Sequence, residues 1–412
     1  MNEWLWPDLA GRRILLGVSG GIAAYKAAEL CRLLSRCGAS VRVMMTVAAR
    51  RFVGETTFAA LSGHPVSTDL FDPVQEGQIG HIALADQTEL LVLAPATANL
   101  LARLAHGLGD DLVSTVCLAY TGPLLLAPAM NVHMWQHPAT RENLHTLLGR
   151  GARSVGPGSG EMACGHVGEG RMAEPGEILQ AVGAGLAPQI LAGRAVLVSA
   201  GPTHEPIDPV RFLGNRSSGK MGFALAAEAA AAGARTTLVA GPSSLSTPLG
   251  VERVDVGTAA EMAAAIKARA PGQDVVVMAA AVADYRPSSA AASKIKKEQT
   301  GSRLTLELTQ TEDILAGLTR LEPRPLLVGF AAETGGDLGA LAARKREAKG
   351  CDLLVANDVS QPDAGFERDH NRVLIQDASG TESLPLLGKR AVAARILGRV
   401  ASSLEARVGA GR

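Results

Sequence analysis

The sequence has 412 residues, more than a single hydrophobic core usually holds, so we expect two domains. Lys and Arg together number 40, as do Asp and Glu, and this balance excludes the broad positive surface of a nucleic-acid-binding protein. Hydrophobic residues make up 47% of the chain and aromatic residues only 3%. The cores must therefore be built from Ala, Val, Leu and Ile, which is typical of helices packed on buried parallel sheets.

Neither a targeting segment nor a membrane span is predicted. Residues 1–13 lack the apolar run of a secretory signal, and no stretch approaches the ~18 apolar residues of a membrane span. The five cysteines are an odd number without a CxxC pair, which argues against a disulfide framework and against a zinc site. We expect a cytoplasmic protein with no membrane or nucleic-acid partner.

The first half alternates apolar runs with helical patterns. Strands are predicted at 14–18, 41–45, 90–94 and 124–127, and helices at 23–37, 111–119 and 175–185. Such alternation predicts a parallel sheet with right-handed crossovers. Ligands bind such sheets at the carboxyl ends of the strands, so the loops after these strands are the candidate site. A Gly-rich stretch at 156–170 interrupts the pattern and is predicted to be a mobile lid.

A second α/β domain is predicted after a short boundary at 185–193, which divides the chain into domains 1–190 and 191–412. Its strands are expected at 195–199, 236–240, 275–279, 326–330 and 353–356, and its helices at 220–232 and 389–404. Residues 305–308 and 373–375 are expected to add edge or hairpin strands.

The loop after the first strand, Gly17–Lys26, is rich in small residues. Ser19 and the backbone N–H groups beside Gly20 can meet a phosphate at the start of a helix. The spacing is not GxGxxG, so a dinucleotide fingerprint is absent and a dehydrogenase with two Rossmann units is not supported. Taken alone, the loop is equally compatible with a tight turn that binds nothing.

Further segments follow the other predicted strands. Pro128, Met130, Asn131, Met134 and Trp135 complete a PxMNxxMW pattern. Together with Gly17–Lys26, Thr46, 94–99, 160–171 and Gly80-His81-Ile82, this pattern resembles the homo-oligomeric flavin-containing cysteine decarboxylases over residues 11–183. A non-catalytic regulator related to these enzymes is the alternative, but the presence of His81 and Cys164 disfavours it.

The resemblance implies a flavodoxin-like domain that binds FMN. Loss of carbon dioxide from a cysteine carboxylate needs an electron sink, which a flavin supplies. The resemblance implies that His81 acts as the base and that Asn131 binds the substrate carboxylate. It also implies that Cys164, on the lid, donates a proton to the product. The expected flavin contacts are Ser19, Gly20, Thr46, Ala94, Thr97, Asn99 and Met130.

Two histidine features stand apart from this resemblance. His133 and His137 have the spacing of two metal ligands on a helix, but Pro138 breaks the helix and no Glu follows His133, so no metal site is expected there. His166 stands where the family usually carries an acidic residue.

The second half carries Gly201–Arg211 and Asn215–Gly222 after its first strand. Residues 214–221 nearly spell a Walker A loop, but Met221 replaces the hydroxyl residue that binds magnesium, so a P-loop NTPase is not expected. These segments, with 279–285, 294–297, 328–334 and 356–359, resemble phosphopantothenate–cysteine ligase over residues 192–377.

This second resemblance implies a Rossmann-like ligase domain that uses CTP and Mg²⁺, with metal ligands that the sequence leaves unknown. Asn215 is expected at the acyl-nucleotide intermediate, although Arg216 replaces the usual His beside it, and Lys294 is expected to contact the nucleotide. The remaining nucleotide contacts implied by the resemblance are Ser217, Ser218, Gly219, Met278, Ala279, Ala280, Asp284, Glu312, Asp313, Ile314, Leu315, Phe330, Lys345 and Lys349.

Both resemblances together predict a bifunctional enzyme of coenzyme A biosynthesis. Its expected small-molecule substrates are 4′-phosphopantothenate, cysteine and CTP. The resemblance also implies a homo-oligomer with trimeric contacts between decarboxylase domains and dimeric contacts between ligase domains.

Overall fold

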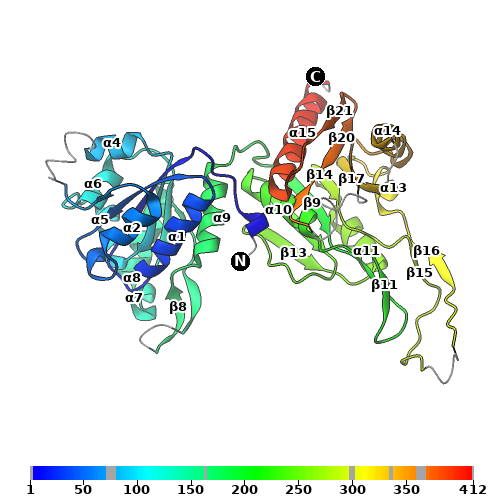
Figure 1. The fold of residues 1–412 in the computed structure, drawn as a ribbon, viewed down its shortest axis with the longest axis horizontal. Helices are drawn as coiled ribbons and strands as arrows, with labels where there is room; N and C mark the ends of the chain where they lie inside the picture. Colours follow the sequence, from blue (N-terminus) through cyan, green and yellow to red (C-terminus); the bar gives the residue numbers. More distant parts are fainter. Residues whose placement is uncertain are drawn as a thin grey trace. The chain divides into compact units, whose positions relative to one another are not determined.

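The computed structural model describes residues 3–70, 80–161, 165–296, 302–333, 337–358 and 368–410. These residues form two compact units (Figure 1). The first unit is Trp6–Ala187, and the second runs from Pro188 onward and includes the short 3-10 helix η1 (Glu3–Leu5).

The first unit is built on a six-stranded sheet in the order β3-β2-β1-β4-β5-β6. Every pairing in it is parallel. Without the two-residue edge strand β3, the order is that of a flavodoxin-like sheet, so the predicted fold class is confirmed. The strands are β1 (Arg13–Val18), β2 (Ser40–Met45), β3 (Val66–Ser67), β4 (Leu90–Ala96), β5 (Leu124–Pro128) and β6 (Arg153–Ser154).

Helices cover both faces of this sheet. Successive buried residues of β1 and β2 contribute to two separate cores, which is why these strands are mostly apolar. One face carries α1 (Ala24–Arg36), α2 (Glu55–Ser62) and α9 (Pro175–Leu186). The other carries α4 (His81–Asp86), α5 (Ala98–His106), α6 (Leu112–Ala119), α7 (Val132–Gln136) and α8 (Pro138–Gly149). A short 3-10 helix, η2 (Ala49–Arg51), follows β2.

The Gly-rich stretch forms an antiparallel hairpin, β7 (Gly158–Glu161) with β8 (Val167–Arg171). The Met130 N–H donates to Gly170 O at 2.9 Å, which attaches β8 to the loop after β5. The described parts of this stretch are therefore paired strands that contact the strand-end loops. The tip that carries Cys164 lies outside the described residues.

The second unit contains an eight-stranded sheet in the order β13-β12-β9-β14-β17-β18-β20-β21. The first six strands are parallel, and β20 and β21 continue the sheet antiparallel. The strands are β9 (Ala195–Ala200), β12 (Arg235–Ala240), β13 (Val251–Asp255), β14 (Val275–Met278), β17 (Leu326–Glu333), β18 (Leu353–Asp358), β20 (Val373–Asp377) and β21 (Gly380–Ser383).

One face of this sheet packs on α10 (Lys220–Ala231) and α15 (Lys389–Ala410), and the other on α11 (Ala259–Arg269), α13 (Ile314–Leu318) and α14 (Leu338–Lys349). The described part of this unit also holds three two-stranded sheets. Their strands are β10 (His204–Pro206) with β11 (Phe212–Gly214), β15 (Tyr285–Pro287) with β16 (Leu308–Gln310), and β19 (His370–Asn371) with β22 (Leu387–Gly388).

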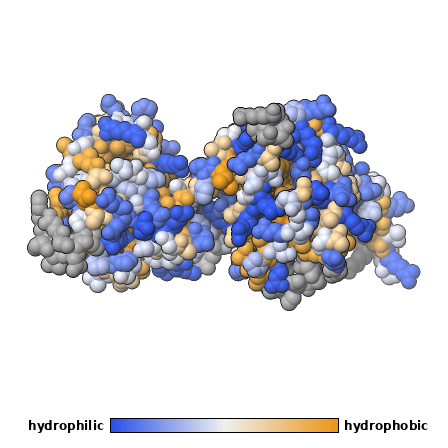
Figure 2. Space-filling model, turned by 90° about the horizontal axis from the view of Figure 1, so that it is seen from above, coloured by the Kyte–Doolittle hydropathy of each residue, from blue (hydrophilic) through white to orange (hydrophobic). Residues whose placement is uncertain are grey.

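The arm formed by β15 and β16 extends from the body of the second unit (Figure 1). A strand was expected at 305–308, but only Leu308 belongs to β16, because pairing with β15 is confined to three residues on each side. Apolar side chains are exposed among polar ones on both units (Figure 2). Over the part of the chain that the structure covers, no helix combines the length and the hydrophobicity needed to cross a bilayer.

Candidate functional site

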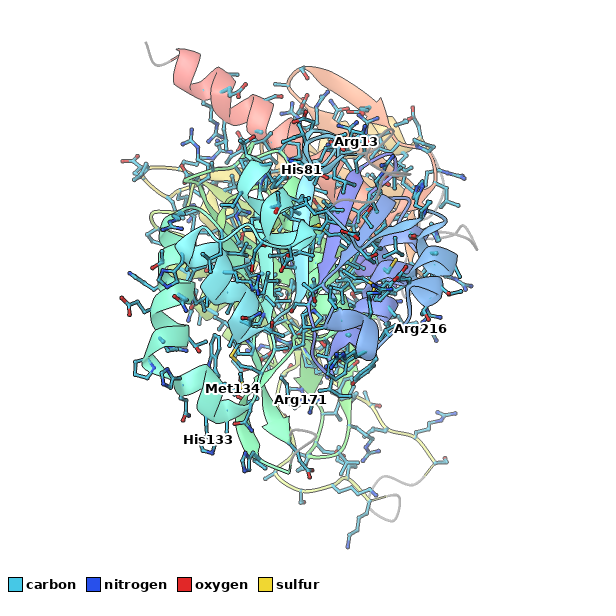
Figure 3. The ribbon with its side chains drawn as sticks, turned by 90° about the vertical axis from the view of Figure 1, so that its left-hand side faces the viewer. Arg13, His81, His133, Met134, Arg171 and Arg216 are labelled. Atoms are coloured by element: carbon cyan, nitrogen blue, oxygen red, sulfur yellow. The ribbon has the colours of Figure 1, made fainter. Side chains whose placement is uncertain are left out.

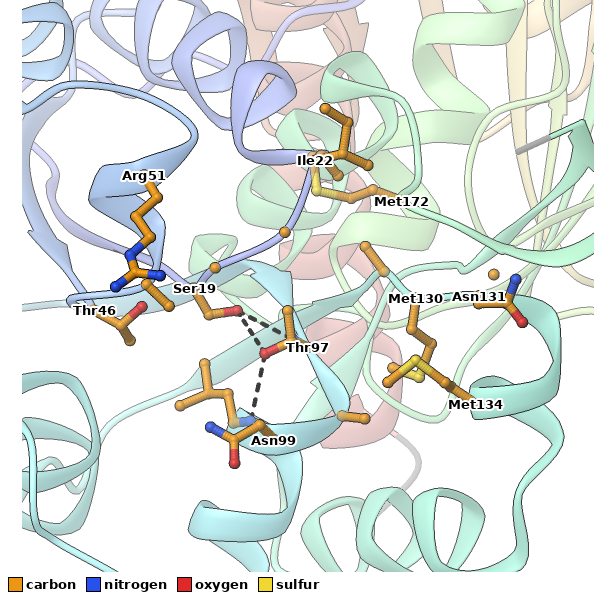
Figure 4. A pocket seen from close by; sticks show the side chains of 18 of the residues that line it. Ser19, Ile22, Thr46, Arg51, Thr97, Asn99, Met130, Asn131, Met134 and Met172 are labelled. Atoms are coloured by element: carbon orange, nitrogen blue, oxygen red, sulfur yellow. Dashed lines mark hydrogen bonds between the residues drawn. The ribbon is translucent and has the colours of Figure 1, made fainter. Parts of the chain in front are cut away.

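A cavity of about 1170 Å³ opens at the carboxyl edge of the first sheet. The loops after β1, β2, β4 and β5 line it, which is where a doubly wound sheet binds its ligands. Every predicted flavin contact lines this cavity except Ala94, which is buried in β4 (Figure 4). Ala94 therefore belongs to the core beneath the cavity. The predicted contacts that line it are Ser19, Gly20, Thr46, Thr97, Asn99 and Met130.

Ser19 joins the loops after β1 and β4. Its buried hydroxyl donates to Pro95 O at 2.6 Å and lies 3.0 Å from Thr97 Oγ1. The Thr97 N–H donates back to Ser19 Oγ at 3.1 Å, and Thr97 caps α5 (Figure 4). Ser19 thus fixes the spacing of the two loops at the rim of the cavity.

Gly20 allows the loops after β1 and β2 to touch. A Cβ at this position would lie 2.4 Å from Ala48 Cβ and 2.8 Å from the carbonyl carbon of Ala48. Gly21 has more room, because a Cβ there would meet Thr97 Cγ2 at 3.4 Å. Packing therefore requires glycine at position 20 but not at position 21.

Several cations line the same cavity. Lys26 is buried, and its Nζ donates to Met172 O at 3.2 Å and to Glu174 Oε1 at 2.7 Å. Arg51 and Arg171 also line the cavity, and Arg51 is exposed. The cavity therefore offers positive charge to an anionic ligand.

Asn131 connects the loop after β5 to the hairpin. Its Oδ1 accepts from the His133 N–H at 2.9 Å, which caps α7, and its Nδ2 lies 2.9 Å from His166 Nδ1. Trp135 is buried beside it and donates from Nε1 to Glu169 Oε2 at 3.1 Å. His166 is therefore a direct hydrogen-bond partner of the predicted carboxylate-binding amide.

His81 does not line the cavity of its own chain. It is the first residue of α4, and it is only half-buried. Figure 3 places it away from Met134 and Arg171, which do line the cavity. The structure thus does not bring together the predicted base and the predicted carboxylate-binding residue within one chain.

A second cavity, of about 580 Å³, lies at the carboxyl edge of the eight-stranded sheet. It is formed by the start of α10, the ends of β14 and β17, and the residues around α13 and α14. It gathers Asn215 and all the predicted nucleotide contacts except Lys294. These contacts are Ser217, Ser218, Gly219, Met278, Ala279, Ala280, Asp284, Glu312, Asp313, Ile314, Leu315, Phe330, Lys345 and Lys349.

Asn215 is fixed by the loop after β14. Its Nδ2 donates to Ala281 O at 3.2 Å and to Val282 O at 3.1 Å. Gly219 follows in the left-handed region, with φ at 78°, and α10 begins at the next residue. The amide of Asn215 is therefore held at the loop that follows β14.

Two lysines of α14 form ion pairs at this cavity. Lys345 Nζ lies 2.5 Å from Glu333 Oε1, and Lys349 Nζ lies 2.5 Å from Asp313 Oδ2. Burial alone would raise the pKa of Asp313, but the hydrogen bond from Lys349 and that from the Ala316 N–H hold this pKa below its usual value. Asp313 consequently stays ionised and keeps Lys349 at the cavity.

Lys294 is exposed and does not line the second cavity. The backbone next to it is anchored by Asp208, whose Oδ2 accepts from the Ile295 N–H at 3.1 Å and from Arg211 Nε at 3.0 Å. Arg211 Nη2 in turn donates to Ile295 O at 2.8 Å. Hydrogen bonding by Arg211 lowers the pKa of Asp208 well below its usual range, so this anchor is a charged one.

Sequence reasoning missed several polar residues that line the cavities. Lys26 and Arg51 line the first, and Lys220, Asn371 and Lys389 line the second. A lysine beside a predicted helix carries no sequence signal that separates it from the ordinary charged surface. Their positions follow from tertiary packing.

The residues covered by the structure contain no cluster of three or more His, Cys, Asp or Glu side chains with metal-binding geometry. His137 caps α8, where its Nδ1 accepts from the Ala139 N–H at 3.2 Å.

Two family profiles match the chain in succession. Residues 7–186 match the profile described as Flavoprotein, and residues 191–404 match the DNA/pantothenate metabolism flavoprotein C-terminal domain. The chain is similar to the coenzyme A biosynthesis bifunctional protein of Vibrio cholerae, with 50% identity over 95% of this chain and 98% of that protein. It is 48% identical to the protein of the same description from Escherichia coli, over 95% and 97% of the two chains.

Among solved structures, the chain is similar to the C-terminal domain of a coenzyme A biosynthesis bifunctional protein. The identity is 39%, the match covers 53% of this chain and 98% of that domain, and the TM-score is 0.45.

Proposed function

The chain belongs to the family of coenzyme A biosynthesis bifunctional proteins, and it is accordingly an enzyme with a decarboxylase and a ligase activity. We propose that the first cavity carries out the decarboxylation and the second cavity the ligation. Residues 191–412 ligate cysteine to 4′-phosphopantothenate through an acyl-cytidylate, converting CTP to CMP and pyrophosphate. Residues 1–190 then use FMN to decarboxylate the product, 4′-phosphopantothenoylcysteine, to 4′-phosphopantetheine.

The observation that carries the ligase assignment is the convergence on the second cavity. Residues chosen from separate segments between 215 and 349 line one cavity at the strand ends. If the motif matches were due to chance, these residues would not be expected to line the same cavity. The cavity also suits the chemistry, because lysines flank it and Asp284, a carboxylate of the kind that binds Mg²⁺, lines it.

The ligation proceeds in two balanced steps. A carboxylate oxygen of 4′-phosphopantothenate attacks the α-phosphorus of CTP, and pyrophosphate leaves. The cysteine amine then attacks the acyl carbon, the bond to CMP breaks, and an amide forms with release of a proton. We assign Asn215, which the loop after β14 holds, to the acyl-nucleotide, and Lys345 and Lys349 to the charge of the pyrophosphate.

The first cavity fits a flavin mononucleotide. Its volume of about 1170 Å³ accommodates an isoalloxazine ring with its ribityl phosphate. Gly20 and Gly21 leave the start of α1 open for backbone N–H groups to approach a phosphate, and Arg51 adds positive charge at the rim. A bound flavin supplies the two-electron oxidation that makes the substrate lose carbon dioxide, and then returns those electrons.

The protein's own residues bind the substrate and move protons. The Asn131 amide, held by the His133 N–H and next to His166, binds the substrate carboxylate. His81 acts as the base, and Cys164 donates the proton that completes the product.

We assign His81 to the cavity of a neighbouring copy. Within its own chain, His81 lies outside the cavity that holds Asn131. Apolar side chains at the mouth of that cavity are exposed, with Ile22, Tyr25 and Val47 at 63%, 59% and 65%. A symmetric homo-oligomer would cover them and complete each site with one histidine from the next protomer.

Mixing two inactive variants tests this assignment together with the decarboxylase mechanism. His81→Asn and Asn131→Ala should each retain flavin and fail to release carbon dioxide. After joint refolding, sites that combine the intact residue of each chain should restore roughly a quarter of the activity, the fraction expected for random assembly of shared sites. Carbon dioxide release by either variant alone, or no restoration in mixed oligomers, would contradict the assignment.

Nucleotide preference tests the ligase assignment. Pyrophosphate release should be measured with the four nucleoside triphosphates, with and without Mg²⁺. We expect the highest rate with CTP and no reaction without the metal. Equal or faster turnover with ATP would remove the CTP assignment, and the absence of pyrophosphate with every nucleotide would remove the ligase mechanism.

A further inference from the structure

Asn371 is a buried polar residue that lines the second cavity. Only 5% of its surface is exposed, and it belongs to the two-residue strand β19. This strand pairs with β22, where Asn371 stands opposite Leu387, and α15 begins two residues after Leu387. Backbone pairing therefore holds Asn371 beside the start of α15.

The two ends of the Asn371 amide differ in their hydrogen bonding. The Arg372 N–H donates to Oδ1 at 3.0 Å, which identifies Oδ1 as the acceptor end of the amide. Within the described parts of the chain, Nδ2 donates to no acceptor. A buried N–H donor without an acceptor costs about 1–3 kcal/mol, and a ligand in the cavity that supplies an acceptor removes this cost.

The groups next to β19 show which kind of acceptor suits this part of the cavity. Asp369, two residues before Asn371, accepts from the Lys389 N–H at 3.0 Å and pairs through Oδ1 with Lys220 Nζ at 2.6 Å. These lysines are the first residues of α15 and α10, so β19 lies next to the N-terminal ends of two helices. Such ends carry partial positive charge and N–H groups without helical partners, which favour a phosphate oxygen as the acceptor.

We infer that Asn371 Nδ2 donates to the phosphate chain of the nucleotide, on the part that leaves as pyrophosphate. The inference rests on the proposed ligase function. The predicted nucleotide contacts at 217–219 lead along the chain from Asn215 to Lys220. Because Asn215 is assigned to the acyl-nucleotide, which keeps the α-phosphate, the other end of this loop suits the two remaining phosphates. Asn371 lies at that end and stabilises the negative charge that develops on the leaving pyrophosphate.

Steady-state kinetics of the full-length protein test this inference. Asn371→Ala should raise the KM for CTP about tenfold to a hundredfold, as expected when a hydrogen bond to a charged group is lost. The inhibition constant of added inorganic pyrophosphate should rise by a similar factor, and the KM values for 4′-phosphopantothenate and cysteine should not change. Asn371→Asp keeps an oxygen that accepts from the Arg372 N–H but donates nothing, so its effect should be at least as large.

Gln376→Ala is the matched control. Gln376 lies on β20 outside the set of residues that line the cavity, and its Nε2 donates to Asp377 O at 3.1 Å. Removal of this amide should leave the KM for CTP and the inhibition by pyrophosphate as in the wild type. Thermal unfolding reports whether each variant keeps its fold, and Asn371→Asp decides if Asn371→Ala does not fold.

Three results would overturn the inference. They are an unchanged KM for CTP in Asn371→Asp, an equal rise in the KM for 4′-phosphopantothenate, and a raised KM for CTP with unchanged inhibition by pyrophosphate. The last result would place the amide at the base or the ribose. A wild-type protein that releases no pyrophosphate contradicts the proposed function, whereas a ligating protein with wild-type kinetics in both Asn371 variants contradicts this inference alone.

Discussion

Replacing Gly20 by alanine tests how the first cavity is built. The added Cβ would lie 2.4 Å from Ala48 Cβ and 2.8 Å from the carbonyl carbon of Ala48, inside the distance that real Cβ contacts reach. Because backbone must move to relieve this overlap, we expect a cost of about 1–3 kcal/mol, as for other overpacked sites. A unit of this size loses roughly 2–4 °C of Tm per kcal/mol, so the first unit should melt about 2–12 °C lower. The displaced loop should also reduce flavin occupancy.

The assay compares Gly20→Ala with Gly21→Ala. Visible flavin absorbance relative to protein absorbance gives the occupancy, and thermal unfolding gives the Tm. Gly21→Ala adds the same methyl group at a position where the nearest atom, Thr97 Cγ2, lies 3.4 Å away, so it should leave the Tm near that of the wild type. Wild-type occupancy and Tm in Gly20→Ala, or equal losses of Tm in both variants, would refute the packing argument.

Three further predictions concern the second unit. Asn215→Ala should abolish pyrophosphate release and leave decarboxylation of supplied 4′-phosphopantothenoylcysteine intact, and loss of both activities in a folded, flavin-bound protein would contradict the separation of the two sites. Asp208→Asn should weaken the anchor at Ile295, which would appear as faster amide hydrogen exchange there and slower ligation; unchanged exchange would remove Asp208 from this role. Affinity for the anionic ligands of the second cavity should fall as the pH rises through about 8, because Lys389, which lines this cavity beside Lys220 and Asp369, loses its proton there, and Lys389→Arg should flatten this dependence. A wild-type affinity that stays constant to pH 10 would contradict the last prediction.

The sequence was sufficient for the central strands of both sheets. Runs such as Ile14–Val18 and Val275–Met278 are apolar at successive positions because helices cover both faces of the sheet, and this pattern is visible without tertiary information. Short elements were not predicted. The strand β3 and the hairpin strands β7 and β8 depend on pairing with distant or Gly-rich segments, which carry weak local signals.

For the candidate sites too, the sequence was sufficient for part of the structure, namely the loops that line the two cavities. The rule that ligands bind at strand ends gathered the loops that carry Ser19, Thr97 and Asn215, and these loops line the two cavities. The same rule says nothing about which chain completes a site, so the positions of His81 and Lys294 outside the cavities could not be foreseen. Lys389 was missed because its burial arises from tertiary packing at the start of α15, where the next residue, Arg390, contacts α10 and η1.

Coupled turnover tests the central claim, that one chain carries both activities in succession, most directly. Purified protein should be incubated with 4′-phosphopantothenate, cysteine, CTP and Mg²⁺, and the products followed by mass spectrometry together with pyrophosphate and carbon dioxide. We predict that 4′-phosphopantetheine forms, with one pyrophosphate and one carbon dioxide released for each molecule. Pyrophosphate release without carbon dioxide from a flavin-bound protein, or 4′-phosphopantetheine formation only when a separate ligase is added, would contradict this prediction.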